Sequence, residues 1–321
     1  MLKNTPAMYK KEHTFLKEVD SLALANVQLH LEKAYKNFFR DPKIGFPRFK
    51  SKHHSKNSYT TNVVNGNILV EGSRIRLPKL KWISMKKHRE PAENCRLKSV
   101  TVSMEPSGKY FASLLYEGYS CENQAADKDY SNAKILGIDY AMQGMAVFSE
   151  EIEMEEAGFF RKNEKRLARE QRKLSRCVKG SRNYVRQKKK VARCHEKIRS
   201  QRRDHLHKLS RRITDQYDIV AVEDIDMKAM SQCLHFGKSV QDNGYGMFRN
   251  MLDYKLAWKG KEIVKVDRFF PSSKKCSKCG KIKKELKLSE RVYRCTCGNE
   301  MDRDRNAAIN IREEARRMLA A

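Results

Sequence analysis

Three acidic residues each end a short apolar segment with the composition of a buried strand: Asp139 after residues 135–138, Glu223 after 219–222 and Asp267 after 263–266. Strands that pair in one sheet can bring such carboxylates together at its edge, and converging carboxylates bind hard divalent ions such as Mg²⁺. Two ions held in this way activate water and stabilise the leaving oxygen in phosphodiester hydrolysis. Each acid taken alone is more typical of a solvated strand end, so the hypothesis depends on several of them meeting.

Four of the nine cysteines have the spacing of a structural metal site. Cys276 and Cys279 form a C-x2-C pair, 15 residues separate it from the C-x-C pair of Cys295 and Cys297, and a glycine follows each pair. Thiolates from two such turns suit a tetrahedral Zn²⁺ ion, which in a closed four-cysteine site is structural and not catalytic. The second pair is one residue shorter than the common spacing, so free thiols or a knuckle without metal are the alternatives.

A second acidic pair, Asp302 and Asp304, follows the cysteines and opens the last segment with helical composition, residues 306–319. The simple interpretation is that acidic side chains are favourable at the N-terminus of a helix. The sharper interpretation is that this pair delivers a third metal-binding carboxylate beside Asp139 and Glu223.

Two weaker signals also have ordinary structural explanations. His205 and His207 resemble a two-histidine metal motif, but residues two apart point in different directions on a helix, and this stretch has helical composition. Residues 36–59 mix aromatic and basic side chains, which could stack on bases and hold phosphates. Burial of Phe38, Phe39, Phe46 and Phe49 in a core explains the same pattern at least as well.

The net charge of the 321-residue chain is +29, which indicates a polyanionic partner, nucleic acid first and an anionic membrane second. Residues 161–212 hold 22 Lys and Arg against four acidic residues, a net charge of +18. This stretch has no proline and one break at Gly180-Ser181, which predicts two long basic helices over residues 161–216. The candidate nucleic-acid contacts are Arg169, Arg172, Lys173, Arg186, Lys188, Lys189, Lys190, Arg202 and Arg203.

Several classes of protein are disfavoured by the sequence. No apolar run approaches the length of a membrane span, and the first residues have no apolar core of a secretory signal. An odd number of cysteines without an export signal favours reduced thiols, and hence a cytoplasmic protein. The sequence also contains no P-loop, HExxH or GxSxG motif.

The elements that must position these residues fall into two parts. Residues 13–39 have helical composition, and short β-rich segments over 60–118 predict a small sheet or barrel. From residue 133 onward strands alternate with helices, which indicates an α/β domain. We therefore expect one domain over residues 1–130 and a second over 131–321, with the basic helices and the cysteine segment 271–300 inside the second.

The motifs occur in an order that resembles the transposon-encoded OrfB/TnpB family, which is related to the type V CRISPR effectors. The segments that carry the resemblance are GID at 137–139, VED at 222–224, VDRFFPSSKKCSKCG at 266–280 and DRDRNAA at 302–308. It extends upstream through QRRD at 201–204 and HKLS at 207–210 to SVTVS at 99–103 and GFPRFK at 45–50, so it spans nearly the whole chain. The stretch from the cysteines to DRDRNAA is its most specific part.

The resemblance implies a fold of class α/β plus β. It implies an RNase H-like (RuvC) nuclease domain with an inserted basic helical pair and a zinc ribbon, preceded by a small wedge-like β-barrel with a helical N-terminal remnant. The family's catalytic positions map onto Asp139, Glu223 and Asp304, with Asp302 as the second choice for the third position. Asp267 then becomes structural. The ribbon would hold Zn²⁺ and bind target nucleic acid.

The resemblance also implies the partners and the reaction. A guide RNA from the transposon end would pair with target DNA, the protein would read a short flanking motif, and Mg²⁺ would support cleavage. The oligomeric state is left open. The alternatives are a catalytically impaired relic or RNA-guided repressor, and an accessory DNA-binding protein of transposition. The first motif corresponds to the end of the family's N-terminal segment, so a barrel strand and a helical segment are expected to be missing, which bears on activity.

Overall fold

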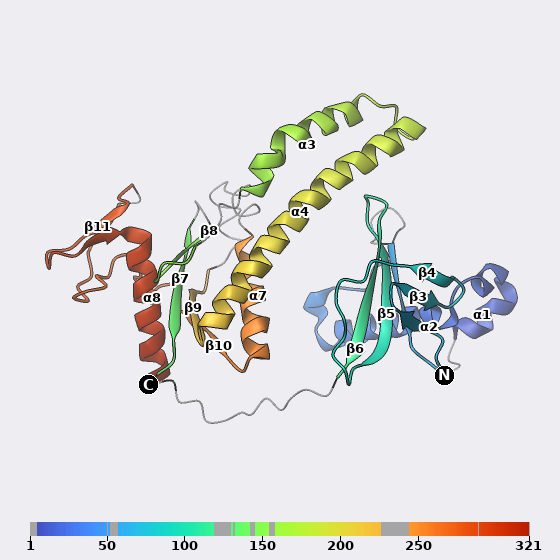
Figure 1. Ribbon diagram of the computed structural model, residues 1–321, viewed down its shortest axis with the longest axis horizontal. Coiled ribbons are helices and arrows are strands. Elements are labelled where there is room, and N and C mark those ends of the chain that lie inside the picture. Colours follow the sequence, from blue (N-terminus) through green and yellow to red (C-terminus); the bar gives the residue numbers. More distant parts are fainter. Residues whose placement is uncertain are drawn as a thin grey trace. The chain divides into compact units, whose positions relative to one another are not determined.

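The structure, a computed structural model, describes residues 5–49, 51, 57–118, 130, 132–141, 145–153, 158–225, 244–287 and 289–320. It divides into two compact units, Met1–Glu122 and Asn123–Ala321. Each unit has its own apolar core. The helices and strands of both units are labelled in Figure 1.

Unit 1 combines an N-terminal helical part with two three-stranded antiparallel sheets, in the orders β1-β5-β6 and β2-β3-β4. Asp20 caps helix α2, because its carboxylate accepts a hydrogen bond of 3.1 Å from the Leu22 backbone N–H. The helix predicted over residues 13–39 therefore begins later than expected. The elements are α1 (Pro6–Glu12), η1 (Thr14–Lys17), α2 (Ser21–Arg40), η2 (Pro42–Ile44), β1 (Asn57–Asn62), β2 (Leu69–Glu71), β3 (Arg74–Leu77), β4 (Lys81–Ser84), β5 (Arg96–Met104) and β6 (Tyr110–Glu117).

The core of unit 1 lies between the two sheets, where Ile68, Ile75, Leu77 and Val100 are buried. The β-rich segments at 68–70, 75–77, 100–104 and 110–116 thus form strands β2, β3, β5 and β6 as expected. The sequence did not predict strands β1 and β4. The sheets are described here as two separate three-stranded sheets, and their closure into a barrel stays a prediction.

Unit 2 is built on a four-stranded mixed sheet in the order β10-β9-β7-β8. Strands β10, β9 and β7 are parallel, and β8 is antiparallel to β7. The mixed α/β composition expected from the sequence is confirmed. The elements are β7 (Ile135–Ala141), β8 (Met145–Phe148), α3 (Phe159–Ser175), α4 (Arg182–Gln216), β9 (Ile219–Glu223), α7 (Tyr245–Trp258), β10 (Glu262–Val266), β11 (Val292–Arg294), β12 (Glu300–Asp302) and α8 (Arg303–Ala320).

Helices cover both faces of this sheet (Figure 1). On one face, Leu136, Ile138 and Val222 pack with buried side chains of α4 and α7, including Ile213 and Phe248. On the other face, Ile135, Ile219 and Ala221 pack against Ile311 and Ala315 of α8. Strand β7 can serve both cores because successive side chains of a strand point to opposite faces. The carboxyl ends of β7 and β9 are therefore held in a rigid, two-sided core.

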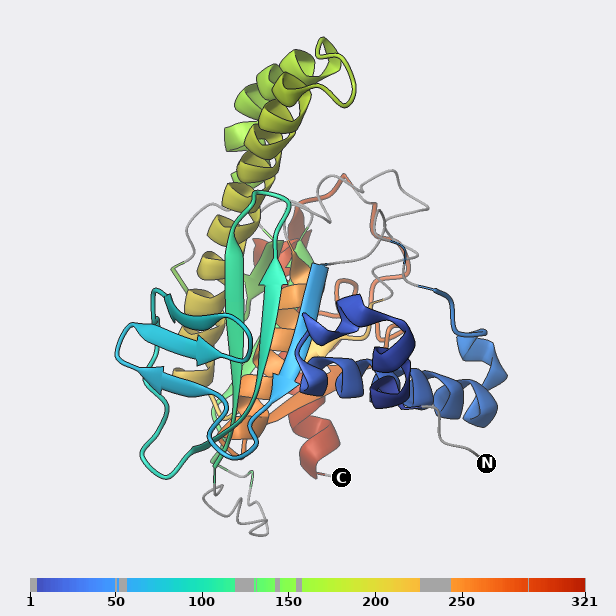
Figure 2. The same cartoon turned by 90° about the vertical axis from the view of Figure 1, so that its right-hand side faces the viewer.

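Helices α3 and α4 form an antiparallel pair whose far end extends beyond the sheet (Figures 1 and 2). The chain turns at Gly180, which has a φ of 83°, and Ser181 then caps α4 by accepting a hydrogen bond of 3.1 Å from the Tyr184 backbone N–H. The second half of α4 buries Leu206, Leu209 and Ile213 against the sheet. The long basic helix is thus anchored at one end by the core.

Candidate functional sites

Asp139 and Glu223 lie next to each other near the carboxyl ends of the two inner strands of the sheet. Asp139 is in β7 and Glu223 is the last residue of β9, and these parallel strands pair Ile138 with Val222, the residues immediately before the two acids. Both side chains are partly exposed. The pairing of β7 with β9 therefore places the two carboxylates side by side, although β7 continues past Asp139 to Ala141 and is longer than the sequence predicted.

Asp304 reaches the same place from the first turn of α8. This helix approaches β7 very closely at Gly137, where a Cβ atom would lie 2.0 Å from the Ala308 carbonyl oxygen. Glycine is thus needed at this position, because any side chain would push α8 off the strand. The Gly137 backbone N–H is satisfied by the Ser149 hydroxyl at 3.0 Å. Close packing of α8 on β7 is what brings Asp304 toward Asp139.

The pKa of Asp139 shows that the three carboxylates interact. Burial raises it well above its ordinary value, and the negative charges of Glu223 and Asp304 raise it further. The Arg303 guanidinium and the backbone N–H of Tyr140 act in the opposite direction. Like charges that face each other in this way favour binding of a cation, because a divalent ion removes the repulsion. This donor set of carboxylate oxygens fits Mg²⁺.

Asp304 is also paired with two arginines. Its carboxylate lies 3.1 Å from the Arg303 guanidinium and 3.7 Å from that of Arg291. Both arginines offset the charge of Asp304, and Arg303 also acts on Asp139. The sequence did not identify this role, because arginines are abundant throughout this chain.

Asp302 and Asp267 lie outside this centre and have local roles. Asp302 accepts hydrogen bonds of 2.9 Å from the backbone N–H groups of Asp304 and Arg305, which makes it the cap of α8. Asp267 is exposed and accepts a hydrogen bond of 2.7 Å from the Phe269 backbone N–H, which closes a turn after β10. Of the acids considered from the sequence, Asp139, Glu223 and Asp304 are the ones that the fold brings together.

Two further residues contact or adjoin the carboxylate centre, and the sequence alone did not indicate them. The Ser272 hydroxyl donates a hydrogen bond to Oε1 of Glu223, which lowers the pKa of Glu223, while burial raises it more and sets the net direction upward. Tyr245, the first residue of α7, is buried, and burial followed by the charge of Asp139 raises its pKa. A serine in a serine- and lysine-rich turn, or a tyrosine in an apolar helix, carries no signal in a single sequence.

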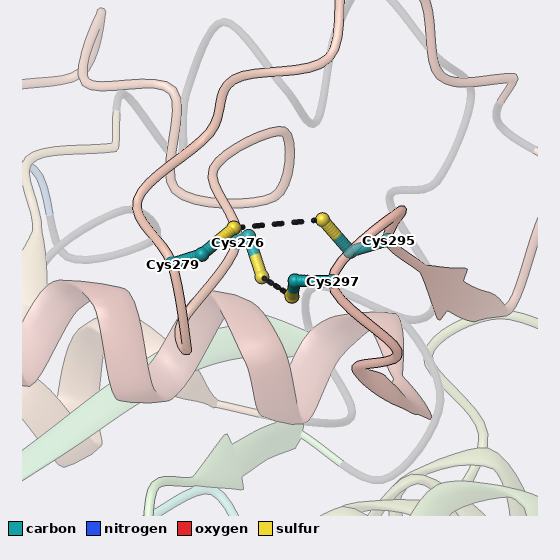
Figure 3. A group of neighbouring side chains, drawn as sticks. All are labelled: Cys276, Cys279, Cys295 and Cys297. Carbon is teal, nitrogen blue, oxygen red and sulfur yellow. Dashed lines mark hydrogen bonds between the residues drawn. The ribbon is translucent and has the colours of Figure 1, made fainter.

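The four cysteines come together as one cluster (Figure 3). Among the described residues they form the one group of potential metal ligands whose donor atoms all lie within 4.8 Å of one another. Cys276 lies 3.7 Å from Cys297, and Cys279 lies 3.7 Å from Cys295, sulfur to sulfur. The short C-x-C spacing of the second pair therefore does not prevent the four sulfurs from converging.

The surroundings of Cys276 favour a thiolate at that position. Burial opposes ionisation of Cys276, but the backbone N–H groups of Cys279 and Lys278 and the Asn299 side chain outweigh it and lower the pKa of Cys276 to about 6. Gly280 and Gly298 have φ values of 76° and 85°, the left-handed conformation that a knuckle turn needs after each pair. Four sulfur donors on two knuckles fit a tetrahedral Zn²⁺ ion.

The basic residues singled out from the sequence are on the surface of the α3–α4 pair. Arg202 is half-buried, and the other eight are exposed. A cavity of about 310 Å³ also lies between the two helices, lined by Asn163, Arg166, Glu170, Lys173, Lys190, Arg193, Cys194 and Lys197. Five of these eight residues are cations, so the cleft as well as the outer surface suits phosphate groups.

The two weaker sequence signals have different outcomes. His205 and His207 lie in helix α4, and the ring of His205 packs edge-on against Phe159 at 5.5 Å, so the pair is part of a helix and not a strand motif. Phe39 and Phe46 are 75% and 62% exposed, which contradicts their assignment to a core. They form a surface group with Tyr35 and Phe38, in which ring centroids lie 5.4 to 6.3 Å apart.

None of the helices in the described part of the chain is long and apolar enough to cross a membrane.

Comparisons with known proteins agree with the motif order. Residues 118–234 match the OrfB_IS605 family model, described as a probable transposase, and residues 245–311 match the Cas12f1-like TNB domain. The structure resembles that of Cas12f1 in a complex with sgRNA and target DNA, with a TM-score of 0.53 and 16% identity over 91% of this chain and 71% of that chain. At this identity the likeness shows a shared fold.

Two similarities that span nearly all of this chain and about three quarters of each relative establish the family. A protein of Streptomyces pristinaespiralis named "Putative RNA-guided DNA endonuclease" is 35% identical over 94% of this chain and 73% of its own length. InsQ of Escherichia coli strain K12, which carries the same description, is 33% identical over 96% of this chain and 78% of its own length. The chain belongs to the OrfB/TnpB family.

Proposed function

We propose that this protein is a transposon-associated, RNA-guided DNA endonuclease whose nuclease centre consists of Asp139, Glu223 and Asp304. The observation that carries the proposal is the convergence of three carboxylates from β7, β9 and α8, where burial and then the charges of Glu223 and Asp304 raise the pKa of Asp139. The full-length relatives named as RNA-guided DNA endonucleases support the substrate class.

The three carboxylates would hold Mg²⁺ near the carboxyl ends of β7 and β9. Mg²⁺ bound there would supply Lewis-acid activation of water and of the phosphate in phosphodiester hydrolysis. The chain's own contribution is rigidity: β7 and β9 fix two carboxylates through a core on both faces, and Gly137 lets α8 bring in the third. Ser272 holds one oxygen of Glu223. This pre-organisation keeps the charged groups in place before substrate arrives.

Guide RNA and target DNA are the proposed partners. The α3–α4 pair carries a large positive charge and precedes β9, the strand that ends at Glu223. A surface of this kind neutralises backbone phosphates without reading sequence, which suits a duplex formed by guide and target strands. Unit 1, with its exposed aromatic group beside basic side chains, is proposed as a further nucleic-acid-binding part.

The cysteine cluster is proposed as a structural Zn²⁺ site. All four positions are taken by protein sulfurs, which leaves no ligand position for substrate. The ion would hold together the segment from Cys276 to Cys297, whose regular structure is limited to short strands β11 and β12. Residues 271–300 would thus act as a ribbon that adds basic surface beside the nuclease centre.

One experiment separates this function from its alternatives. The protein is purified from cells that carry its native flanking DNA, the bound RNA is sequenced, and DNA matching that RNA is offered with Mg²⁺. Bound RNA with cleavage supports the endonuclease, bound RNA without cleavage indicates an RNA-guided repressor or relic, and absence of RNA indicates an accessory DNA-binding protein.

A further inference from the structure

The segment from Ser272 to Ser277 connects the carboxylate centre with the cysteine cluster. At one end, the buried Ser272 donates its hydroxyl hydrogen bond to Oε1 of Glu223. At the other end, the segment contains Cys276, the buried member of the cluster. Three residues therefore separate a side chain that holds a nuclease carboxylate from a sulfur that would hold zinc.

Helix α8 fixes the backbone of this segment through two buried asparagines. Nδ2 of Asn310 donates to the carbonyl oxygens of Ser272 and Lys275, at 2.7 Å each. Asn306 donates from Nδ2 to the Lys275 carbonyl oxygen at 2.8 Å and accepts from the Ser277 backbone N–H at 3.0 Å. Buried amides that lose such partners are costly, so the segment is held firmly in one conformation.

The same network continues into the cluster. The Asn299 side chain, which follows the second cysteine pair, donates to Sγ of Cys276 at 3.5 Å and to the Ser277 hydroxyl at 3.3 Å. Both cysteine knuckles are thus tied to the segment that carries Ser272. Displacement of the first knuckle would strain these contacts, because Cys276 lies between Lys275 and Ser277, which are both bound by Asn306.

We propose that Ser272 is a positioning residue for Glu223, and that metal in the cysteine cluster sets the geometry of the nuclease centre through residues 272–277. The inference rests on the proposed function, since it assigns Glu223 to that centre. The Ser272 hydroxyl engages Oε1 and thereby orients the carboxylate toward the other acids. Groups of this kind around a metal ligand commonly change metal affinity or activity by about 10- to 100-fold when they are removed.

The chain offers a matched pair of variants for the test, because Ser273 is adjacent and half-buried. Mn²⁺ binding to the full chain with its bound RNA is measured by electron paramagnetic resonance, which needs no cleavage. We expect Ser272→Ala to weaken Mn²⁺ binding by about 10-fold. Ser273→Ala is expected to bind Mn²⁺ as the parent does, and Ser272→Thr, which keeps the hydroxyl, to restore binding.

A second arm tests the link with the cysteine cluster. Cys297→Ser is expected to lower the zinc content and to weaken Mn²⁺ binding, and adding Ser272→Ala to it should weaken binding no further. Cys177→Ser, outside the cluster, is the control for loss of a thiol. Fully additive effects of Cys297→Ser and Ser272→Ala would overturn the link.

Two results would count against the proposal for distinct reasons. Equal Mn²⁺ affinity of Ser272→Ala and Ser273→Ala overturns the role of Ser272 while the proposed function stands. Equal affinity of the parent and Asp139→Ala shows that the carboxylate centre holds no metal, and then the proposed function fails together with the inference.

Discussion

The carboxylate of Asp302 accepts the backbone N–H of Asp304 at 2.9 Å, so two acids that are two residues apart have separate tasks. Asp302 caps helix α8, and Asp304 stands in its first turn with a charge that acts on Asp139. A cap and a metal ligand can therefore be distinguished by substitution.

We predict that Asp302→Ala lowers the free energy of unfolding by about 0.5–2 kcal/mol, the usual cost of losing an N-cap. Asp304→Asn should instead keep the stability and abolish Mn²⁺ binding, because it removes a charge from the carboxylate centre. Chemical denaturation and electron paramagnetic resonance of the two variants measure these effects. Loss of Mn²⁺ binding in Asp302→Ala but not in Asp304→Asn would show that Asp302, and not Asp304, is the metal ligand.

The raised pKa of Asp139 predicts how the stability of the metal-free chain depends on pH. The folded state binds this proton more tightly than the unfolded state, whose pKa is near 3.8. The contribution of Asp139 to stability is therefore complete below that value and is lost as pH rises through the raised pKa. Without metal, the melting temperature of Asp139→Asn should rise relative to that of the parent chain as pH increases. Added Mg²⁺ should raise the melting temperature of the parent and leave that of Asp139→Asn unchanged.

The close approach at Gly137 gives a prediction with an internal control. Gly137→Ala should reduce stability by about 1–3 kcal/mol and weaken Mn²⁺ binding, because an added Cβ overlaps α8 and pushes Asp304 away. Gly246 lies in helix α7 with no neighbouring atom within 4 Å of an added Cβ. Gly246→Ala should therefore be neutral or stabilising, since alanine favours a helix. Denaturant unfolding measures the free energy of unfolding of both variants. Comparable losses of stability in Gly137→Ala and Gly246→Ala would refute the steric argument.

Zinc removal should unfold the cysteine segment and spare the sheet core. Strands β11 and β12 form only a two-stranded sheet, which is marginal in water without further support. Amide hydrogen exchange before and after treatment with a chelator should show lost protection at residues 292–302 and retained protection in β7 and β9. Protection that survives chelation would show that the segment does not depend on metal.

The sequence predicted strands β7, β9 and β10 of unit 2 because their apolar runs are short and end in acidic residues, whereas β11 and β12 were not predicted. The order of the motifs also indicated Asp139 and Glu223 as candidate nuclease acids, and the cysteine spacing indicated the four candidate zinc ligands. These features depend on local composition and spacing, which a single sequence records directly.

Other features depend on contacts that composition does not record. The resemblance already ranked Asp304 before Asp302, but the role of Asp302 as the cap depends on where α8 begins, one residue after it. Ser272 became visible as a partner of Glu223 only once the turn after β10 was placed against β9. Phe39 and Phe46 were open to two interpretations, because an aromatic residue in a sequence looks the same in a core and on a surface.

The central claim is tested most directly by cleavage of DNA that matches the RNA bound to the protein, in Mg²⁺, by Asp139→Asn, Glu223→Gln and Asp304→Asn. Asp253→Asn is the matched control, since Asp253 is exposed on α7. We predict that the control cleaves like the parent, and that the other three keep their RNA and lose cleavage by about 100-fold or more, the scale expected when a transition-state contact is removed. Cleavage that persists in all three would contradict the account.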